Sequence, residues 1–377
     1  VDGERLVAEH LGRRPPRPVR RRGLFACGKA AVAMASGAFG SARFDGMLVV
    51  APRGVAVPKA LRAAVRFAAH PEPDASSIAA ARAAIAFFGG FRREDEILAL
   101  ISGGASSLLC LPRPGVTLAE KRTRIRRAMR AGWPIGKINR LRIALSAVKG
   151  GRLADATPAR VTTLVLSDVP GDFRIVGSGP TVSRRKAGDR VFLLADNRTG
   201  LAAAASAARK TGAAVRVRRK PISGEASEEG RRFAKRLRLA ATVGRRELVL
   251  IAGGESTVSI AGRPGVGGRN QEIALAAALE IEGETGLSIL AAGSDGVDGN
   301  SENAGARVDG RTAGRARRRG LEPDRFLASH DSASFFAASG GALRTGPTGT
   351  NVADWLFGYA FRRASPISCI VSARMTR

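Results

Sequence analysis

Several turns in this sequence place glycine beside basic or hydroxyl side chains directly after a short apolar run. Lys29 follows the run Leu24–Cys27 and one glycine, and a lysine at a strand end can hold its charge against a phosphoryl group in transfer. The turn Ser102–Ser107 combines Gly103 and Gly104 with three serines, and backbone N–H groups in such a turn favour a bound anion. Both turns also fit a solvated lysine and an ordinary strand-to-helix connection that needs glycine for positive φ.

Two further turns carry pairs of carboxylates. Ser167–Asp172 places Asp168 and Asp172 four residues apart around Pro-Gly, and Gly293–Gly299 repeats the pattern from Asp295. Paired aspartates in glycine-rich turns suit Mg²⁺, which is often held by one or two carboxylates and several waters. Aspartate and glycine are also what turns need for their own geometry. The metal ligands that we predict are Asp168, Asp172 and Asp295.

Two more glycine-rich loops lie in the second half of the chain. Gly265–Glu272 precedes an Ala/Leu-rich helix predicted at Ile273–Leu279, and it places Arg269 at the helix start. Thr345–Asn351 is dense in hydroxyl side chains and glycine. Neither loop matches a dinucleotide-binding fingerprint or a Walker A motif. Each turn alone is a weak signal, but their occurrence together in one α/β chain indicates a site for phosphate chemistry.

These turns need elements that bring them to one place. Short β-branched runs alternate with Ala-rich stretches, which predicts parallel α/β layers whose ligands lie at the carboxyl ends of the strands. Helices are predicted at Pro73–Phe88, with Asp74 or Ser76 as its cap, and at Leu118–Ala131, with a capping box of Thr117 and Glu120. The predicted strands are Leu24–Cys27, Gly46–Ala51, Glu96–Ser102, Val161–Leu166, Leu248–Ala252 and Leu287–Ala292.

Composition limits the class of protein. A chain of 377 residues with 44% hydrophobic residues has enough apolar material for two domains. The sequence contains no apolar run long enough to span a membrane, so we expect no membrane partner. No secretory h-region follows the N-terminal arginines. Three widely spaced cysteines form neither a disulfide framework nor a zinc pattern, which favours a reducing cytoplasm.

The net charge of +30 points first to nucleic acid. The charge is mostly arginine, however, and it is spread along the chain, while aromatic residues make up only 5%. No platform of interleaved basic and aromatic residues is visible. We therefore interpret the charge as a bias toward arginine on solvated surfaces.

The motifs belong to nine ordered segments between about Gly23 and Asp354. They are GKAAVAMA (Gly28–Ala35), HPEPD (His70–Asp74), ISGGASSLL (Ile101–Leu109), INRLRIALSAVKGGRLA (Ile138–Ala154), SDVPGDFRIVGSGPTV (Ser167–Val182), GGESTV (Gly253–Val258), GVGGRNQE (Gly265–Glu272), SDGVDG (Ser294–Gly299) and TGPTGTNVAD (Thr345–Asp354). In these segments the chain resembles the ATP-dependent glycerate 2-kinases with a MOFRL C-terminal domain.

The resemblance implies two α/β/α, Rossmann-like domains with mainly parallel sheets and an active-site cleft between them. Because Ser183–Glu229 is weakly patterned and highly charged, we place the boundary shortly after it. This gives a glycerate-kinase-type domain at residues 1–240 and a MOFRL-type domain at 241–377. The implied reaction transfers the γ-phosphoryl of ATP to the 2-hydroxyl of D-glycerate, with Mg²⁺ present. ATP and glycerate are the expected partners, and monomer and homodimer both stay open.

The resemblance assigns the family's functional positions to Lys29 and Arg269, which we expect to neutralise charge on the transferring phosphoryl group. Asp168 or Asp295 would hold Mg²⁺ or orient the attacking hydroxyl. Asn139, Arg142 and Lys149 would grip the glycerate carboxylate or simply shape the site. The residues expected to bind nucleotide or substrate are Ser102, Gly103, Gly104, Ser106, Asn139, Arg142, Lys149, Glu255, Gly267, Gly268, Asn270, Thr348 and Asn351.

The chain departs from the family pattern at five places. Ala105 replaces a glycine, Ser294 replaces a threonine, Trp133–Lys137 lacks the usual acidic neighbourhood, and the region after Val182 is shortened. Trp355–Arg377 lies where the family closes with an apolar strand, and we expect a divergent tail there that would destabilise the second domain.

Three alternatives to the kinase stay open. A hydroxypyruvate or tartronate reductase would need a nicotinamide site, and no G-x-G-x-x-G follows a predicted strand. A nucleic-acid-binding protein would use the positive charge. An inactive kinase fold would follow from the departures.

Overall fold

The chain forms two compact units in the computed structural model, which describes residues 1–131, 133, 135–169, 171–183, 188–243, 247–260 and 262–361. The first unit comprises residues 1–199 and 347–352, and the second comprises residues 200–346 and 353–377. The first change between the units comes after residue 199. Helix α8 (Ala226–Val243), which contains the predicted domain boundary at residue 240, packs against elements of the second unit.

The first unit is built on a parallel sheet. Six strands among the described residues pair in the order β3-β2-β1-β4-β5-β6, and every neighbouring pair is parallel. The strands are β1 (Arg22–Cys27), β2 (Gly46–Pro52), β3 (Val65–Ala68), β4 (Glu96–Ser102), β5 (Arg160–Leu166) and β6 (Arg190–Ala195). The helices and 3-10 turns are α1 (Gly3–Arg13), α2 (Ala31–Phe39), η1 (Lys59–Ala64), α3 (Ala75–Gly89), α4 (Ala105–Leu108), α5 (Leu118–Arg130), α6 (Ile135–Ala144), η2 (Ala154–Ala156) and η3 (Phe173–Ser178).

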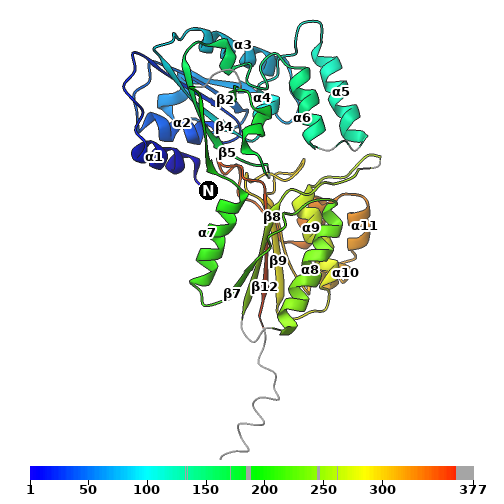
Figure 1. Cartoon of the computed structure of the whole chain (residues 1–377). Helices are drawn as coiled ribbons and strands as arrows, with labels where there is room; N and C mark the ends of the chain where they lie inside the picture. The colour runs from blue at the N-terminus through cyan, green and yellow to red at the C-terminus, as the bar shows by residue number, and fades with distance from the viewer. Residues whose placement is uncertain are drawn as a thin grey trace, which may run out of the picture. The chain divides into compact units, whose positions relative to one another are not determined.

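Central strands of this sheet are covered on both faces. All seven residues of β4 are buried, as expected for a parallel strand with helices on each side. Phe25 of β1 and Phe88 of α3 belong to the core on one face, while α2 contacts β1, β2 and β4 on the other (Figure 1). The α/β class and the parallel sheet predicted for this half are confirmed.

Local capping fixes the helix starts as predicted. The Asp74 side chain accepts the N–H of Ser76 at 2.8 Å and forms a capping box at the start of α3. At the start of α5, the N–H of Glu120 donates to Thr117 Oγ1 at 3.1 Å, while the Glu120 carboxylate accepts the Thr117 N–H. These reciprocal bonds satisfy N–H groups that a helix start leaves without partners.

The second unit contains a mixed sheet. Its strand order is β11-β10-β9-β12-β8-β7, and among the described residues only the β7–β8 pair is parallel. The strands are β7 (Ala214–Val217), β8 (Leu248–Gly254), β9 (Leu287–Gly293), β10 (Gly305–Asp309), β11 (Ala342–Leu343) and β12 (Asp354–Ala360). Its helices are α8, α9 (Arg269–Glu280), α10 (Thr312–Arg317), α11 (Pro323–Ala328) and α12 (Ser332–Ser339), and α7 (Asn197–Arg209) begins at the end of the first unit.

Our prediction of a mainly parallel sheet is wrong for this unit. The connection from β9 to β10 contains no helix, and it turns the chain back as an antiparallel pair; parallel neighbours need a longer crossover. β12 also runs antiparallel to both β8 and β9. One face of the sheet packs against α8 and α9 and the other against α7 (Figure 1), so the α/β class itself is confirmed.

The predicted loss of the closing strand is also wrong. The segment Asp354–Ala360 forms β12, which lies between β8 and β9 and pairs with each along seven residues. Leu356 and Ala360 are buried in the core shared with α8 and α9, and Trp355 packs beside the α7 face. The rest of the predicted tail, 362–377, lies outside the described residues.

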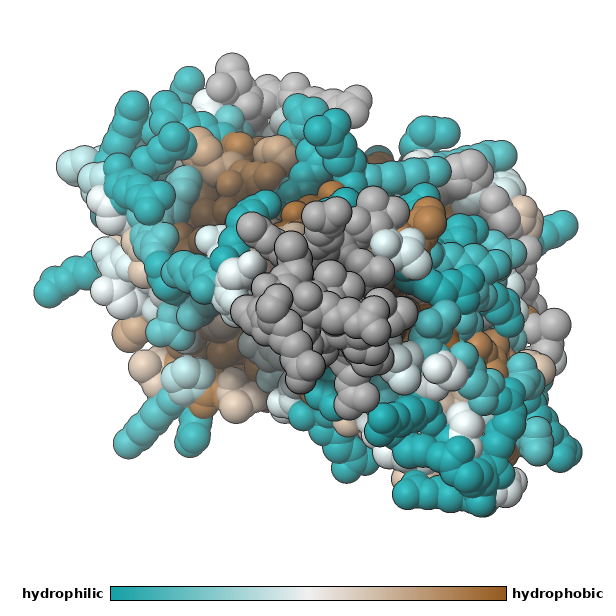
Figure 2. Space-filling model, turned by 90° about the horizontal axis from the view of Figure 1, so that it is seen from below, coloured by the Kyte–Doolittle hydropathy of each residue, from teal (hydrophilic) through white to brown (hydrophobic). Residues whose placement is uncertain are grey.

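Hydrophilic side chains project from much of the face shown in Figure 2, with apolar areas between them. No helix among the described residues has the length and apolar character needed to cross a membrane.

Candidate active site

Three predicted turns meet at one edge of the first sheet. Lys29, Ser102 and Asp168 follow β1, β4 and β5, which are neighbours in the sheet and run in the same direction. The Lys29 N–H donates to the carbonyl of Gly103 at 2.8 Å, and the Ala30 N–H donates to Ser102 Oγ at 3.0 Å. The carboxyl ends of these parallel strands therefore bring the predicted residues together, as such sheets do at ligand sites.

Gly103 leaves room for a polar contact between distant segments. Asn351 Nδ2 donates to Asp168 Oδ2 at 3.0 Å. A Cβ at position 103 would lie 1.9 Å from Asp168 Oδ2 and 2.4 Å from Asn351 Nδ2. Only glycine permits this approach, so Gly103 has a structural role beside the predicted contact with an anion. Thr348 belongs to the same segment, and its hydroxyl accepts the Thr350 N–H at 3.5 Å.

Gly104 lies against Lys29 and His70. It has φ of +85°, and a Cβ there would lie 3.1 Å from Lys29 Cγ and 3.2 Å from the His70 ring. Among the described residues, the N–H groups of Gly104, Ala105 and Ser106 donate no hydrogen bond. The turn can therefore present several donors beside a lysine, although α4 is a single turn and adds little helix dipole.

Lys149 is hydrogen-bonded to this turn. Its side chain is buried, and its ammonium donates to the Ser106 carbonyl at 2.8 Å, to Ser106 Oγ at 3.0 Å and to the Gly177 carbonyl at 3.1 Å. Protein oxygens thus accept all three protons that a lysine can donate. Of the two roles that we left open for Lys149, the geometry favours shaping the site over gripping a substrate carboxylate.

Other basic groups surround Lys149. Lys121 is buried, and burial lowers its pKa while the neighbouring Cys110 opposes that shift. The Arg142 guanidinium is half-buried and donates to Asn139 Oδ1 at 3.3 Å. Burial, and then the positive charge of Lys121 and of Arg142, lowers the pKa of Lys149 to about 7. Lys121 was absent from the sequence prediction, because its burial depends on how α5 packs.

We expect this shift to make stability depend on pH. The pKa of Lys149 is about 7 in the folded protein and 10.5 ordinarily, so between these values the unfolded chain binds more protons and the free energy of unfolding rises with pH. Replacing Lys149 by methionine should remove this contribution to the slope. Urea unfolding measured across that window tests it, with Lys59→Met at an exposed position as the control that keeps the slope. An unchanged slope in Lys149→Met would contradict the assignment.

Asp172 is paired with its near neighbour Arg174. Its carboxylate accepts the Arg174 Nε–H at 2.8 Å, the Arg174 Nη2–H at 3.2 Å and the Arg174 N–H at 3.0 Å, so it caps η3. Both oxygens are therefore engaged by one arginine. The charge of Arg174 compensates that of Asp172, and the place of Asp172 as a metal ligand stays a prediction. Pro170 of the same motif lies outside the described residues.

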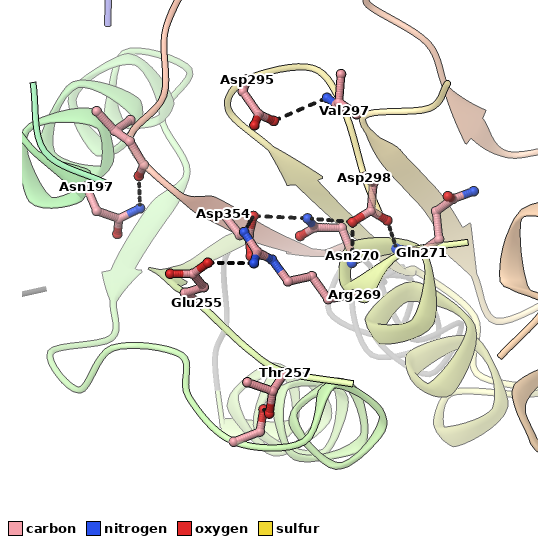
Figure 3. Close-up of polar contacts among 12 residues, drawn as sticks. Asn197, Glu255, Thr257, Arg269, Asn270, Gln271, Asp295, Val297, Asp298 and Asp354 are labelled. Atoms are coloured by element: carbon pink, nitrogen blue, oxygen red, sulfur yellow. Dashed lines mark hydrogen bonds and ion pairs between the residues drawn. The ribbon is translucent and has the colours of Figure 1, made fainter. Parts of the chain in front are cut away.

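Arg269 is the centre of a polar cluster in the second unit (Figure 3). It is the first residue of α9, and its Nε and Nη2 donate to the two oxygens of Asp354 at 2.5 and 3.1 Å. Its Nη1 donates to Glu255 Oε1 at 2.6 Å. Burial opposes the charge, but the carboxylates of Asp354 and Glu255 still raise the pKa of Arg269. The guanidinium is therefore fixed in orientation, and its side chain keeps 33% exposure.

Asp298 caps the same helix. Its carboxylate accepts the N–H of Asn270 at 3.0 Å and that of Gln271 at 2.8 Å, and Asn270 Nδ2 bridges it to Asp354 (Figure 3). A Cβ at Gly268 would lie 2.4 Å from the Asp298 carboxyl group. Burial raises the pKa of Asp298 to about 7, against the hydrogen bonds that favour its charge. Gly268 therefore leaves the space in which the Asp298 carboxylate caps α9.

The loop Gly265–Gly268, for which we predict contacts with an anion, has hydrogen bonds within the protein. The Val266 N–H donates to Asp331 at 2.9 Å, and the Gly267 N–H donates to Asn300 at 2.8 Å. These donors, like the capped N–H groups of α9, already have partners within the protein. A phosphate bound to the Gly267 N–H would have to replace Asn300 as its partner, so both Gly267 and the Arg269 side chain stay predictions.

Asp295 lies in the turn after β9. Its Oδ1 accepts the Val297 N–H at 3.2 Å (Figure 3), and its side chain is half-buried. Among the described residues, no group of three or more His, Cys, Asp and Glu side chains is arranged to hold a metal ion. Because Mg²⁺ in phosphoryl transfer takes one or two carboxylates and substrate oxygens, Asp168 and Asp295 fit such a role better than Asp172.

Comparisons with known proteins agree across both units. Residues 1–211 match a family model described as a domain of unknown function, DUF4147, and residues 248–354 match the MOFRL family. A D-glycerate 2-kinase from Thermotoga maritima is 34% identical, with 77% of this chain and 78% of that protein covered. A crystal structure of a Thermotoga maritima glycerate kinase matches with a TM-score of 0.83 and 32% identity, covering 96% of each chain. The chain belongs to the glycerate 2-kinase family with a MOFRL domain.

One relative in this family carries a different name. A protein from Agrobacterium vitis, 37% identical over 90% of this chain and 87% of its own length, has a provisional hydroxypyruvate reductase name. The two names describe different chemistry, so the residues at the site have to decide between them.

Two of the departures from the family pattern are accommodated by local packing. Ala105 is fully buried, and Gly177 faces it so closely that a Cβ there would lie 2.9 Å away. Ser294 is buried and its N–H donates to the Ala353 carbonyl. Lys137 lies 3.8 Å over the Trp133 ring, while residues 184–187 in the shortened region lie outside the described residues.

Four polar residues at these sites were missed in the sequence-based selection. They are His70, Lys121, Asp298 and Asp354. His70, Asp298 and Asp354 stand inside the motifs quoted for the family, which was the available signal. Their partners lie in distant segments, so sequence spacing alone did not single them out.

Proposed function

We propose that this chain transfers the γ-phosphoryl group of ATP to the 2-hydroxyl of D-glycerate, giving 2-phosphoglycerate. The observation that carries the proposal is the gathering of Lys29, the Gly104 turn and Asp168 at the carboxyl edge of β1, β4 and β5. A lysine beside unpaired backbone donors suits the charge that spreads over the oxygens of a transferring phosphoryl group. Membership of the glycerate 2-kinase family supports the choice of glycerate.

We assign the roles of the side chains as follows. Lys29 neutralises charge on the phosphoryl group from the first unit, and Arg269, held rigidly by Asp354 and Glu255, supplies a second cation. Asp168, oriented by Asn351, accepts a hydrogen bond from the attacking hydroxyl and so orients it. Lys149 holds the Ser106 turn in place. A preoriented guanidinium loses little entropy when it binds an anion, which favours such a clamp.

Mg²⁺ would bind at Asp168 or Asp295 and neutralise charge on the nucleotide phosphates. A cytoplasmic location stays a prediction, with the free thiols of Cys27 and Cys110 as support.

The test is turnover by the purified chain with D-glycerate, ATP and Mg²⁺. We expect ADP release and phosphate at the 2-position, identified by NMR of the product. Product at another carbon would contradict the proposed regiochemistry. Oxidation of NADH with hydroxypyruvate, without ADP release, would favour the reductase. Folded protein that turns over neither substrate would indicate an inactive member of the family.

A further inference from the structure

A basic pocket lies in the second unit, and none of the residues that line it is assigned to the reaction. Its loop is nevertheless adjacent to the reaction residues, since the Glu255 N–H donates to the Ile222 carbonyl. The pocket has a volume of about 360 Å³ and is formed by the connection from β7 to α8 and the first turns of α8. Four basic and two acidic side chains line it together with Ser223 and Gly224. The charged residues are Arg218, Lys220, Arg232, Arg236, Glu228 and Glu229.

The acidic side chains of the pocket are already paired. Glu229 is buried and ion-paired with Arg218, and its Oε2 also lies 3.1 Å from Arg232 Nη2. Arg232 lies 3.2 Å from Glu228 as well. In contrast, Lys220 and Arg236 pair with no carboxylate among the described residues. The pocket therefore holds two positive charges in excess, which matches a dianion.

The position in the fold also favours an anion. β7 and β8 are parallel and α8 connects them, and in such a unit the carboxyl end of the strands and the helix start face ligands. The buried Nε of Arg218 has no hydrogen-bond partner among the described residues. The pocket is larger than a bare phosphate needs, since pockets of this volume hold small organic molecules.

We propose that this pocket binds the phosphate group of a small phosphomonoester through residues other than those assigned to phosphoryl transfer. Lys220 and Arg236 supply the charge that the phosphate neutralises, and Ser223 supplies a hydroxyl donor. Glu229 holds Arg218 and Arg232 in orientation and contacts no ligand itself.

Isothermal titration calorimetry on the full chain, without ATP or glycerate, tests the proposal with glycerol 3-phosphate and inorganic phosphate. We expect the monoester to bind more tightly than inorganic phosphate, because its organic part occupies the rest of the pocket. The double variant Lys220→Gln/Arg236→Gln should weaken the binding of both ligands by about tenfold or more. Each substitution removes a cation and with it one charge-assisted hydrogen bond to the phosphate. The double variant Arg219→Gln/Arg231→Gln removes equal charge at exposed positions outside the pocket, and it should bind like the wild type.

Equal affinities of the two double variants would overturn the proposal, as would no binding to the wild type. Lys29→Ala should keep the affinity, and its loss there would show that the probe occupies the catalytic site instead. Because binding is measured without turnover, an inactive chain that binds normally would contradict only the kinase assignment.

Discussion

Replacing Arg269 by alanine is expected to lower kcat/KM for glycerate phosphorylation about a thousandfold and to destabilise the second unit by about 3 kcal/mol. The activity loss follows from removing a cation that two carboxylates hold in one orientation. The stability loss follows because Asp354 is buried and would lose the cation that compensates its charge. Steady-state kinetics and urea unfolding measure the two effects separately.

A double-mutant cycle separates these two roles. Asp354→Asn combined with Arg269→Ala removes the buried charge as well as its partner, so part of the stability should return while activity stays low. Arg263→Ala, at an exposed position before the same helix, is the matched control and should change neither quantity. If the double variant is as unstable as the sum of the single variants, the Arg269–Asp354 pair does not carry the stability that we assign to it.

Replacing Lys29 by alanine is expected to lower kcat about a hundredfold or more and to change stability little. The fold holds this residue through its backbone, since its N–H donates to the Gly103 carbonyl, and alanine keeps that bond. The side chain is half-buried beside Gly104, so truncation removes mainly charge. Kinetics at saturating ATP and glycerate give kcat without the contribution of weakened binding.

Two further variants make this result specific. Lys29→Arg keeps the charge and should retain more activity than alanine, although a guanidinium has a different shape. Lys59→Ala removes a lysine from an exposed position of the same unit and should behave like the wild type. A Lys29→Ala enzyme that raises KM alone would show that the lysine binds the ground state and does not act on the transferring group.

Local sequence patterns predicted those elements whose ends are set by residues within or next to the element itself. β4 was predicted at its observed bounds because an apolar run buried on both faces ends in two glycines. The capping box at Thr117 fixed the start of α5. The type of the site residues was predicted in the same way, since phosphate chemistry at parallel strand ends uses glycine, lysine and hydroxyl groups.

Pairings over long sequence distances were not predictable in this way. Asn351 reaches Asp168 across 183 positions, and Asp354 reaches Arg269 across 85. We predicted a tail at β12 because its sequence shows no clear alternation of polar and apolar residues. The segment forms a strand by pairing with β8 and β9 on either side. The direction of a strand likewise depends on its neighbours, which is why the second sheet was assigned the wrong pairing.

The place of β12 has a consequence for synthesis on the ribosome. Translation delivers the strands in sequence order, so β7 and β8 emerge long before the residues of β12 that connect them to β9. Until those residues leave the exit tunnel, β8 and β9 each expose an edge of unpaired backbone. Such edges can pair with strands of other chains, and chaperones protect them. The first unit's sheet has all six strands by residue 195, so it can form while the second is still incomplete. A premature stop before Asp354 would therefore release a product with one complete sheet and one open sheet, which is a target for proteolysis.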